Sequence, residues 1–195
     1  SRAEVQQMRH AADAVLTGIG TVMADNPLLT DRTGLPRRRP LVRVVLDSKL
    51  RLPRRSKLVR TAQGDVLVYT RAAADSSKAR ALKKAGVEIV QIRGRKNQID
   101  LKAVVEDLGR REMLSLMIEG GSRVNGAALA AEVVDKVVLF YAPKLLGADG
   151  VPFVAAAGGS LTSLPPLRIQ ATKRFGPDFM VEGYLRDVYR SSWAN

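Results

Sequence analysis

The sequence predicts an α/β fold with a mixed, mostly parallel sheet flanked by helices. Short apolar runs alternate with amphipathic stretches from residue 41 to residue 141, as expected for parallel strands that helices cover on both faces. After residue 166, two strand-like runs flank the turn Phe175-Gly176-Pro177-Asp178, which predicts a C-terminal antiparallel hairpin. With 195 residues and 46% hydrophobic content, the chain suits a single domain, residues 1–195.

The first forty residues predict a helix, a strand and a polar loop. Apolar side chains recur at helical spacing over residues 2–16, which favours a helix. Leu16–Val22 predicts a short buried strand, and its two glycines indicate close approach of a ligand or of another backbone. Asp25-Asn26-Pro27 predicts a turn, because proline keeps Asn26 out of the helical region, and a polar loop follows to Pro40.

Strands and helices alternate through the middle of the chain. Apolar runs predict strands at residues 41–46, 66–69, 87–91, 114–118 and 136–141. Helical spacing predicts helices at residues 76–85, 101–108 and 124–131, with Gly86 as the cap that ends the first of them. A basic loop is expected at 50–60, and a glycine- and proline-rich connection is expected at 143–166. The two strands of the hairpin are expected at 167–174 and 179–185, and a loosely held tail at 191–195.

Composition excludes several classes of site. Without cysteine the chain forms neither a disulfide nor a cysteine-ligated zinc site, and with His10 as its only histidine a metal would need oxygen ligands alone, so we assign no metal site. No apolar stretch is long enough to span a membrane and no signal-peptide pattern is found, so we expect a cytoplasmic protein without a membrane partner.

Positive charge is the strongest compositional feature. The net charge is +13, and 10 of the 32 basic residues lie between Arg37 and Arg60, where Asp47 is the only acidic residue. Such a cluster suits nucleic acid, a small phosphorylated ligand or plain solvation. Only 5% of the residues are aromatic and none lies within the cluster to stack on bases, so we expect no nucleic-acid partner and favour a phosphorylated small molecule.

The run from Leu114 to Leu129 is the most informative stretch of the chain. A predicted buried strand leads into Glu119-Gly120-Gly121-Ser122, and an alanine-rich helix follows. This order places backbone N–H groups and a helix N-terminus where an anion such as a phosphate can bind. Glycines also occur where a strand turns tightly into a helix and nothing binds, so the pattern alone leaves both interpretations open.

Three motifs in this order resemble one enzyme family. They are residues 21–30 (Thr-Val-Met-Ala-Asp-Asn-Pro-Leu-Leu-Thr), Glu119–Ser122 with Asn125-Gly126, and residues 143–147 (Pro-Lys-Leu-Leu-Gly). Together they are similar to the reductase domain of bacterial riboflavin biosynthesis, usually the C-terminal half of a bifunctional deaminase-reductase. The resemblance covers nearly the whole chain and implies a dihydrofolate-reductase-like fold.

The resemblance implies NADPH-dependent reduction of 5-amino-6-(5-phosphoribosylamino)uracil to the ribitylamino compound. The cofactor supplies the hydride in such a reaction, so the protein needs neither a metal nor a cysteine. Alternatives are a related reductase of the same fold that acts on another pyrimidine or pterin substrate, and a catalytically silent nucleotide-binding domain.

Family motifs also imply the site residues. Arg9, Leu29, Arg32 and Glu119 match substrate-contacting positions, with Arg9 and Arg32 expected to hold the phosphate. Glu119 is the expected catalytic residue, either as a hydrogen-bond acceptor that orients substrate or as an aid to proton transfer. Arg9 as a solvated helix residue, and Arg32 as part of a basic loop, are the simpler alternatives. The cofactor contacts implied by the resemblance are Thr21, Asp25, Ser48, Gly121, Ser122, Arg123, Val124, Asn125, Gly126 and Ala127.

The chain departs from the family pattern in two segments. The family's first strand, of the Ala-Ser-Leu-Asp-Gly type, is missing ahead of residues 2–16, and the deaminase half with its cysteine ligands is missing too. We therefore expect a reductase domain with a deaminase as a possible partner. The family also implies a homodimer, for which the apolar run Val137–Phe140 is a candidate interface. Ser48 and the Thr70-Arg71 pair are candidates to bind the 2′-phosphate of NADPH.

Overall fold

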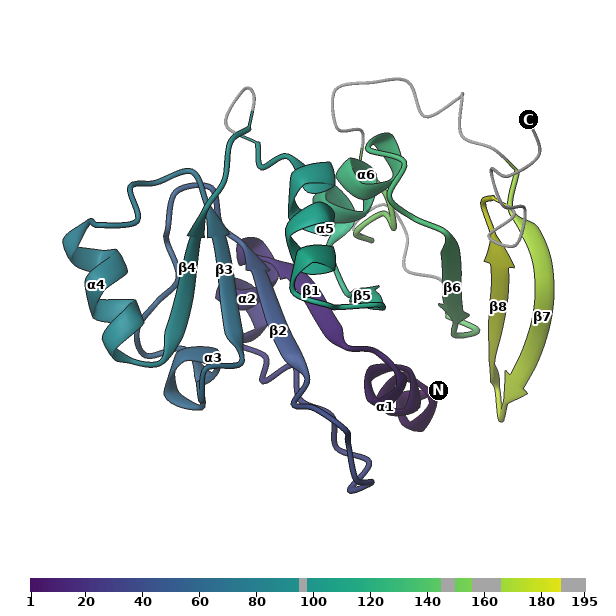
Figure 1. Cartoon of the computed structure of the whole chain (residues 1–195). Helices are drawn as coiled ribbons and strands as arrows, with labels where there is room; N and C mark the ends of the chain where they lie inside the picture. The colour runs from purple at the N-terminus through teal and green to yellow at the C-terminus, as the bar shows by residue number, and fades with distance from the viewer. Residues whose placement is uncertain (95–97, 145–149, 156–165, 187–195) are drawn as a thin grey trace.

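The computed structural model describes residues 1–94, 98–144, 150–155 and 166–186 (Figure 1). The helices of this part are α1 (Arg2–Ala11), α2 (Ile19–Asp25), α3 (Lys57–Arg60), α4 (Ser77–Lys84), α5 (Leu101–Arg110) and α6 (Ser122–Ala130). The strands are β1 (Ala14–Gly18), β2 (Val42–Leu46), β3 (Val66–Thr70), β4 (Val87–Gln91), β5 (Leu116–Ile118), β6 (Lys136–Tyr141), β7 (Arg168–Phe175) and β8 (Asp178–Tyr184).

A five-stranded parallel sheet forms the centre of the molecule, with the strand order β4-β3-β2-β1-β5. β1 lies between β2 and β5, with Leu16 opposite Val44 on one side and opposite Ile118 on the other. All residues of β1 and β3 are buried, which is why these strands are continuously apolar apart from Thr17 and Thr70. The predicted α/β class and parallel sheet are confirmed.

Helices cover both faces of this sheet (Figure 1). One face packs against α2, α3 and α4 through side chains that include Val22, Leu58 and Leu82. The opposite face packs against α5 through Val104 and Leu108, and α6 adds Val124 to its border. Two core layers therefore hold the strands from above and below, so their carboxyl ends are fixed with respect to one another.

The C-terminal strands form a second, antiparallel sheet with the order β6-β8-β7. β7 and β8 are the predicted hairpin, and Gly176 at its turn has φ 62°, a backbone conformation that favours glycine. Among the described residues β6 pairs only with β8, and β5 pairs only with β1. The sheet system is thus mixed, as predicted, but it is divided into two parts. None of the described helices is long and apolar enough to cross a membrane.

The bounds of two predicted elements near the N-terminus are wrong. The helix predicted over residues 2–16 ends at Ala11, and the strand predicted over Leu16–Val22 is replaced by β1 followed by α2. The cause is Asp13, whose carboxylate accepts the backbone N–H groups of Leu114 and Ser115 at 2.8 and 3.0 Å and so draws the chain into register with β5.

The basic loop predicted at residues 50–60 contains the short helix α3. Ser56 begins it by accepting the N–H of Val59 with its hydroxyl, a common helix cap. The predicted strands 41–46, 66–69, 87–91 and 136–141 are confirmed within one residue, while β5 is shorter than predicted. Most of the predicted connection 143–166, part of the Pro-Lys-Leu-Leu-Gly motif and the predicted tail lie outside the described residues.

Candidate active site

Glu119 lies directly after β5, at the carboxyl edge of the parallel sheet. Its N–H donates to the carbonyl of Leu16 at 2.9 Å, and its own carbonyl accepts the hydroxyl of Thr17 at 2.8 Å. Both partners belong to β1, so the central strand fixes the backbone at the point where the sheet ends. Ligands of open α/β sheets bind outside this edge.

The Glu119 side chain forms a bidentate ion pair with Arg9 from α1. Arg9 Nε donates to Oε1 at 2.5 Å and Nη2 donates to Oε2 at 2.6 Å, while Nη1 donates to the carbonyl of Thr30 at 3.1 Å. The side chains are only 11% and 21% exposed. Bonding to Glu119 raises the pKa of Arg9 against the opposing effect of burial. Two residues 110 positions apart are thereby joined in one half-buried, charge-assisted unit.

The other two predicted substrate residues differ in exposure. Arg32 is exposed, and its backbone N–H donates to Oε1 of Gln6 at 2.9 Å, which holds it beside α1. Leu29 is 3% exposed and packs in the core with Val15 and Val22. Its φ of 54° is in the left-handed region. The geometry therefore makes Arg32 available to an anion and keeps the Leu29 side chain away from the surface.

The glycine turn after Glu119 is closely packed against β1 and α6. A Cβ atom on Gly18 or on Gly120 would come within 2.7 Å of the Val124 side chain. A Cβ atom on Gly121 would lie 3.7 Å from Thr21 Oγ1, so the Thr21 hydroxyl borders the turn. Small residues at these positions let α2 and α6 begin side by side at the sheet edge.

The first turn of α6 presents backbone donors there. Gly121 precedes the helix, and its carbonyl accepts the N–H groups of Val124 and Asn125. The N–H groups of Ser122 and Arg123 begin the helix and have no acceptor within it by geometry. A helix N-terminus of this kind favours an anion.

Three further predicted cofactor residues, Asn125, Gly126 and Ala127, lie deeper in α6. The Asn125 amide donates to the carbonyl of Phe153 at 2.9 Å, and a Cβ atom on Gly126 would meet the carbonyl of Ala155 at 2.0 Å. These contacts give Asn125 and Gly126 a packing role against residues 153–155. Sequence motifs alone do not distinguish that role from ligand binding.

The remaining predicted cofactor residues lie along the same sheet edge. Asp25 is exposed one helical turn after Thr21 in α2, so the two side chains share a face. Ser48 follows β2, and its carbonyl accepts the N–H of Arg71 at 3.2 Å. The edge thus runs from Glu119 through Thr21 to Ser48, which suits an extended ligand.

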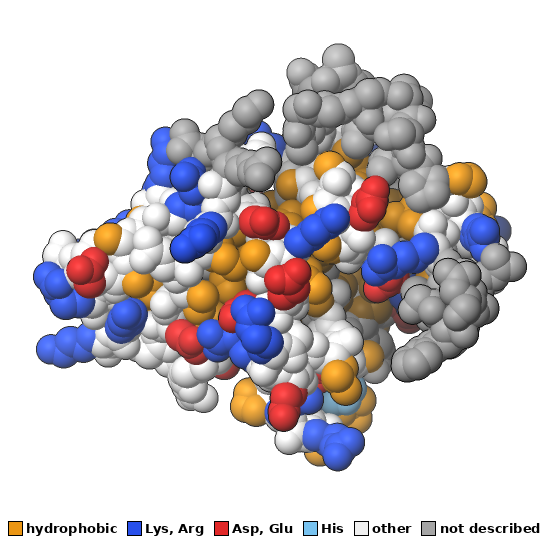
Figure 2. All heavy atoms as spheres, turned by 45° about the horizontal axis from the view of Figure 1, so that its top comes forward, with side chains coloured by type: hydrophobic (Ala, Val, Ile, Leu, Met, Phe, Trp, Pro, Cys, Tyr) orange, Lys and Arg blue, Asp and Glu red, His pale blue; other side chains and the backbone are white. Residues whose placement is uncertain are grey.

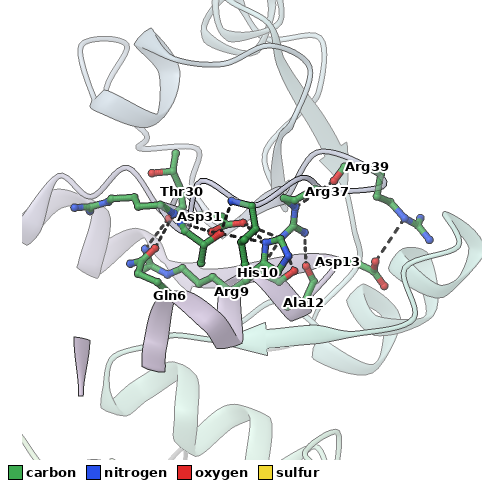
Figure 3. Close-up of polar contacts among 12 residues, drawn as sticks. Gln6, Arg9, His10, Ala12, Asp13, Thr30, Asp31, Arg37 and Arg39 are labelled. Carbon is green, nitrogen blue, oxygen red and sulfur yellow. Dashed lines mark hydrogen bonds and ion pairs between the residues drawn. The ribbon is translucent and has the colours of Figure 1, made fainter. Parts of the chain in front are cut away.

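Sequence reasoning missed a polar network beside Arg9 (Figure 3). Asp31 accepts hydrogen bonds from Thr33 and His10, and Arg37 reaches both Asp31 and the C-terminal end of α1. Burial of Asp31 opposes its ionisation, but the bonds from Thr33, His10 and Arg37 outweigh that effect and hold its pKa well below the ordinary range. Asp31 directly precedes the predicted substrate residue Arg32, and this proximity was the only sequence feature that could have pointed to the network. Hydrophobic periodicity carries no information about such polar contacts.

Three arginines of the basic cluster Arg37–Arg60 form ion pairs with acidic residues of the same chain. Arg39 pairs with Asp13, Arg43 with Asp65 and Arg51 with Asp47, at 3.5, 2.8 and 3.7 Å. Figure 2 shows the basic side chains of one face spread out, with acidic side chains between them. On this face the basic side chains therefore form no continuous patch.

Comparison with known proteins finds relatives over nearly the whole chain. The family model described as RibD C-terminal domain matches residues 1–181. The riboflavin biosynthesis protein RibD of Actinobacillus pleuropneumoniae is 33% identical over 184 residues, which are 93% of this chain and 48% of that protein. The 2,5-diamino-6-ribosylamino-4(3H)-pyrimidinone 5′-phosphate reductase of Archaeoglobus fulgidus is 31% identical over an alignment of 186 residues that covers 91% of this chain and 81% of that protein.

A solved structure from Thermotoga maritima has the same fold. It is a diaminohydroxyphosphoribosylaminopyrimidine deaminase/5-amino-6-(5-phosphoribosylamino)uracil reductase, 28% identical, with a TM-score of 0.75 over 94% of this chain and 48% of that chain. The chain spans about half the length of the RibD relatives it matches. The predicted fold and resemblance are therefore confirmed.

Proposed function

Since this chain belongs to the RibD C-terminal domain family, we propose that it is an NADPH-dependent pyrimidine reductase of riboflavin biosynthesis. Its substrate is 5-amino-6-(5-phosphoribosylamino)uracil and its product is the 5-phosphoribitylamino compound. The substrate combines a sugar phosphate with a polar ring, so binding requires cations and hydrogen-bonding groups at one edge of the sheet.

The observation that carries this proposal is the Arg9–Glu119 pair beside the glycine turn. The pair lies at the carboxyl edge of β1 and β5, next to the N-terminus of α6. A substrate held at Glu119 would lie next to a cofactor whose phosphates approach Gly121 and Ser122. Close placement of two reactants is the main contribution a protein makes to hydride transfer.

The residues present fit a dinucleotide. The Ser122 and Arg123 N–H groups and the Thr21 hydroxyl are donors for phosphate oxygens, and the glycines keep side chains away from the turn. Asp25 and Ser48 extend this surface along the sheet edge. When bound, the nicotinamide cofactor supplies the hydride that converts the ribose C1 to a CH₂ group, and one proton is taken up with it.

NADPH rather than NADH is the finer part of the proposal. Ser48 and Arg71 are held together by a backbone hydrogen bond at the ends of β2 and β3, where a 2′-phosphate would gain from a hydroxyl and a guanidinium. The variant Arg71→Ala should lose much of its preference for NADPH in steady-state kinetics. An unchanged preference would remove Arg71 from the site.

Glu119 orients the substrate in this proposal. Both of its carboxylate oxygens accept N–H groups of Arg9, so the carboxylate is fixed in position and can accept hydrogen bonds from ring or ribose N–H and O–H groups. The same pairing leaves Arg32 as the exposed arginine for the substrate phosphate, in place of the joint role expected for Arg9 and Arg32.

A second substrate is favoured by one relative. The Archaeoglobus fulgidus protein, which this chain covers over 81% of its length, is named for a 2,5-diamino-pyrimidinone ribosylamino phosphate. That ring carries an amino group where the uracil has an oxygen, so a hydrogen-bonding group at one ring position separates the two substrates. A site whose side chains hydrogen-bond to this ring position can discriminate strongly between the two substrates.

The test is the loss of NADPH absorbance with the uracil substrate, the diamino-pyrimidinone and dihydrofolate. We expect rapid oxidation with the uracil substrate and none with dihydrofolate. Glu119→Gln should lower kcat/KM about 100-fold, because it keeps the shape and loses the charged pairing. Glu106→Gln, a change of the same kind on an exposed helical residue, is the control. NADPH-induced thermal stabilisation without oxidation of any substrate would indicate the silent nucleotide-binding alternative instead.

Partners complete the proposal. We expect a homodimer, supported by the half-buried apolar residues Val137–Phe140 of β6, which the described residues leave incompletely covered. A deaminase domain or partner is expected from the bifunctional name of the Thermotoga maritima relative. Membrane and nucleic-acid partners are not part of the proposal, and the cytoplasmic location stays a prediction.

A further inference from the structure

Arg37 holds the C-terminal end of α1, the helix that carries Arg9. Its Nη1 donates to the carbonyls of Arg9 and His10 at 3.0 and 2.6 Å, and its Nη2 donates to the carbonyl of Ala12 at 2.6 Å. Its Nε donates to the carbonyl of Arg39 at 3.2 Å. The last carbonyls of a helix have no partner within it, so one guanidinium here supplies what the helix lacks.

Asp31 holds the facing loop. One carboxylate oxygen accepts the N–H and the hydroxyl of Thr33 at 2.9 and 2.8 Å. The other accepts from His10 Nδ1 at 2.7 Å and from Arg37 Nη1 at 3.4 Å. The Asp31 side chain is 8% exposed, so few water molecules can replace these contacts. The carboxylate therefore ties the loop to both α1 and Arg37.

The two anchors meet at Arg9. Arg37 holds the Arg9 main chain, while the Arg9 side chain donates to Thr30, the residue that precedes Asp31. Figure 3 shows Arg9, His10, Asp31 and Arg37 gathered between α1 and this loop. Arg9 is thus fixed from its backbone and from its guanidinium end, and Arg32 follows Asp31 directly.

We propose that Arg37 and Asp31 are positioning residues that hold Arg9, and through it Glu119, in the geometry that binds the phosphorylated substrate. The inference rests on the proposed function, because it takes Arg9 and Glu119 as the substrate site. It also explains part of the basic cluster, since Arg37 acts within the molecule as a clamp. Its forked donors reach carbonyls in several directions, which a lysine cannot do.

The test uses Arg37→Gln, Arg37→Lys and Asp31→Asn, with Arg38→Gln as control. Arg38 is the exposed neighbour, so its change removes the same charge without touching the network. The first readout is hydrogen exchange of the Arg9 Nε–H in the NMR spectrum, a signal that Arg9→Lys identifies by its loss. The second is kcat and KM for the phosphorylated substrate, and the third is the melting temperature.

We expect the Arg9 Nε–H to exchange much faster in Arg37→Gln and Arg37→Lys than in the wild type. KM should rise about tenfold while kcat changes less than about threefold, because the lost interaction is shared by the ground state and the transition state. Asp31→Asn should show the same pattern more weakly, and it serves as the informative variant if Arg37→Gln does not fold. Arg38→Gln should match the wild type in all three readouts.

Two results would overturn the proposal. One is slow exchange of the Arg9 Nε–H in folded Arg37 variants. The other is a lower melting temperature or faster exchange with an unchanged KM, which would make the network structural only. If the wild type oxidises no NADPH with any substrate, the proposed function fails, and the exchange measurement still decides whether Arg37 positions Arg9.

Discussion

At the scale of single residues, the contact between Arg9 and Glu119 explains how a carboxylate can end a half-buried strand. An unpaired charge at that place would be costly, and the bidentate partner with the short distances of 2.5 and 2.6 Å removes the cost. The sequence indicated both residues through family motifs. It did not indicate their pairing, because 110 positions separate them and no local pattern links α1 to β5.

Arg43 gives the clearest stability prediction at this scale. It is 2% exposed in β2 and donates to Asp65, Thr61 and the Leu28 carbonyl. Arg43→Met would leave the partly buried Asp65 carboxylate without its cation. We expect a loss of about 3 kcal/mol in the free energy of unfolding, measured by urea denaturation.

The control for Arg43 is the double variant Arg43→Met with Asp65→Asn. It removes the orphaned charge, so it should recover part of the lost stability. If the free energy of unfolding of Arg43→Met lies within about 1 kcal/mol of the wild-type value, the Arg43–Asp65 ion pair contributes little to stability.

Asp31 predicts a specific dependence of stability on pH. Its pKa in the folded protein is depressed, so the ionised carboxylate stabilises the fold above its unfolded pKa of about 3.9, and this contribution is lost as the pH falls through the folded value. Asp31→Asn should therefore be less stable than the wild type at pH 7. The difference should shrink as the pH is lowered below about 4.

Melting temperatures of both proteins across this pH range would measure the effect. The comparison with Asp31→Asn is needed because Asp13, Asp65 and Asp107 have depressed pKa values as well and contribute their own acid sensitivity. A stability difference that is independent of pH would assign the stabilisation to shape rather than to the charge of Asp31.

At the scale of elements, local patterns predicted most strands but not the start of the chain. β2, β6 and the hairpin were recognisable because apolar continuity or a turn motif marks each of them. The boundary between α1 and β1 was not, since Ala12, Val15 and Leu16 fit both a helix face and a doubly covered strand. Long-range contacts through Asp13 decide the outcome, and such contacts leave no periodic signal.

The cofactor-side residues show the same limit. The glycine turn and the α6 N-terminus followed from sequence order, because strand, glycines and helix are contiguous. The packing of Asn125 and Gly126 against residues 153–155 did not, since the contact crosses an intervening strand. Sequence motifs therefore located the site but did not separate residues that face a ligand from residues that support the turn.

Gly18 and Gly20 allow a matched test of close packing at the α2 N-terminus. A Cβ atom on Gly18 would approach Val124 Cγ2 to 2.7 Å, whereas a Cβ atom on Gly20 would meet nothing within 4 Å. Gly18→Ala should weaken NADPH binding by displacing α6, measured as a smaller thermal shift with the cofactor. Gly20→Ala should keep binding and add about 0.5–1 kcal/mol of stability, because alanine loses less backbone entropy in a helix.

The pair of variants isolates the cause. Equal cofactor binding in Gly18→Ala and Gly20→Ala would show that Val124 can move aside without disturbing the turn. Weaker binding in both would point to the backbone freedom of the glycines instead of their closeness to α6.

At the scale of the whole molecule, the two sheets differ in how well they are covered. The parallel sheet is enclosed between α2–α4 and α5, while β6, β8 and β7 leave many side chains partly exposed. Both faces of the antiparallel sheet carry an aromatic pair, Phe140 with Phe175 and Tyr141 with Phe179. Aromatic side chains that the described residues leave partly exposed on a sheet are common at contacts between subunits.

The last prediction concerns this sheet as a homodimer interface. Tyr141 and Phe179 are opposite each other in β6 and β8, stack at 4.9 Å between ring centroids, and are 44% and 42% exposed. Replacing both by serine should convert a dimer of 21.2 kDa chains to a monomer in light scattering, because aromatic side chains contribute most to such interfaces. Leu114→Ser, at a residue 89% exposed and remote in sequence from this sheet, is the control and should leave the mass unchanged. The surface would be excluded as a homodimer interface if the wild type were monomeric at micromolar concentration or if the double variant stayed dimeric. In either case the exposed aromatic side chains of this sheet would not be needed for association.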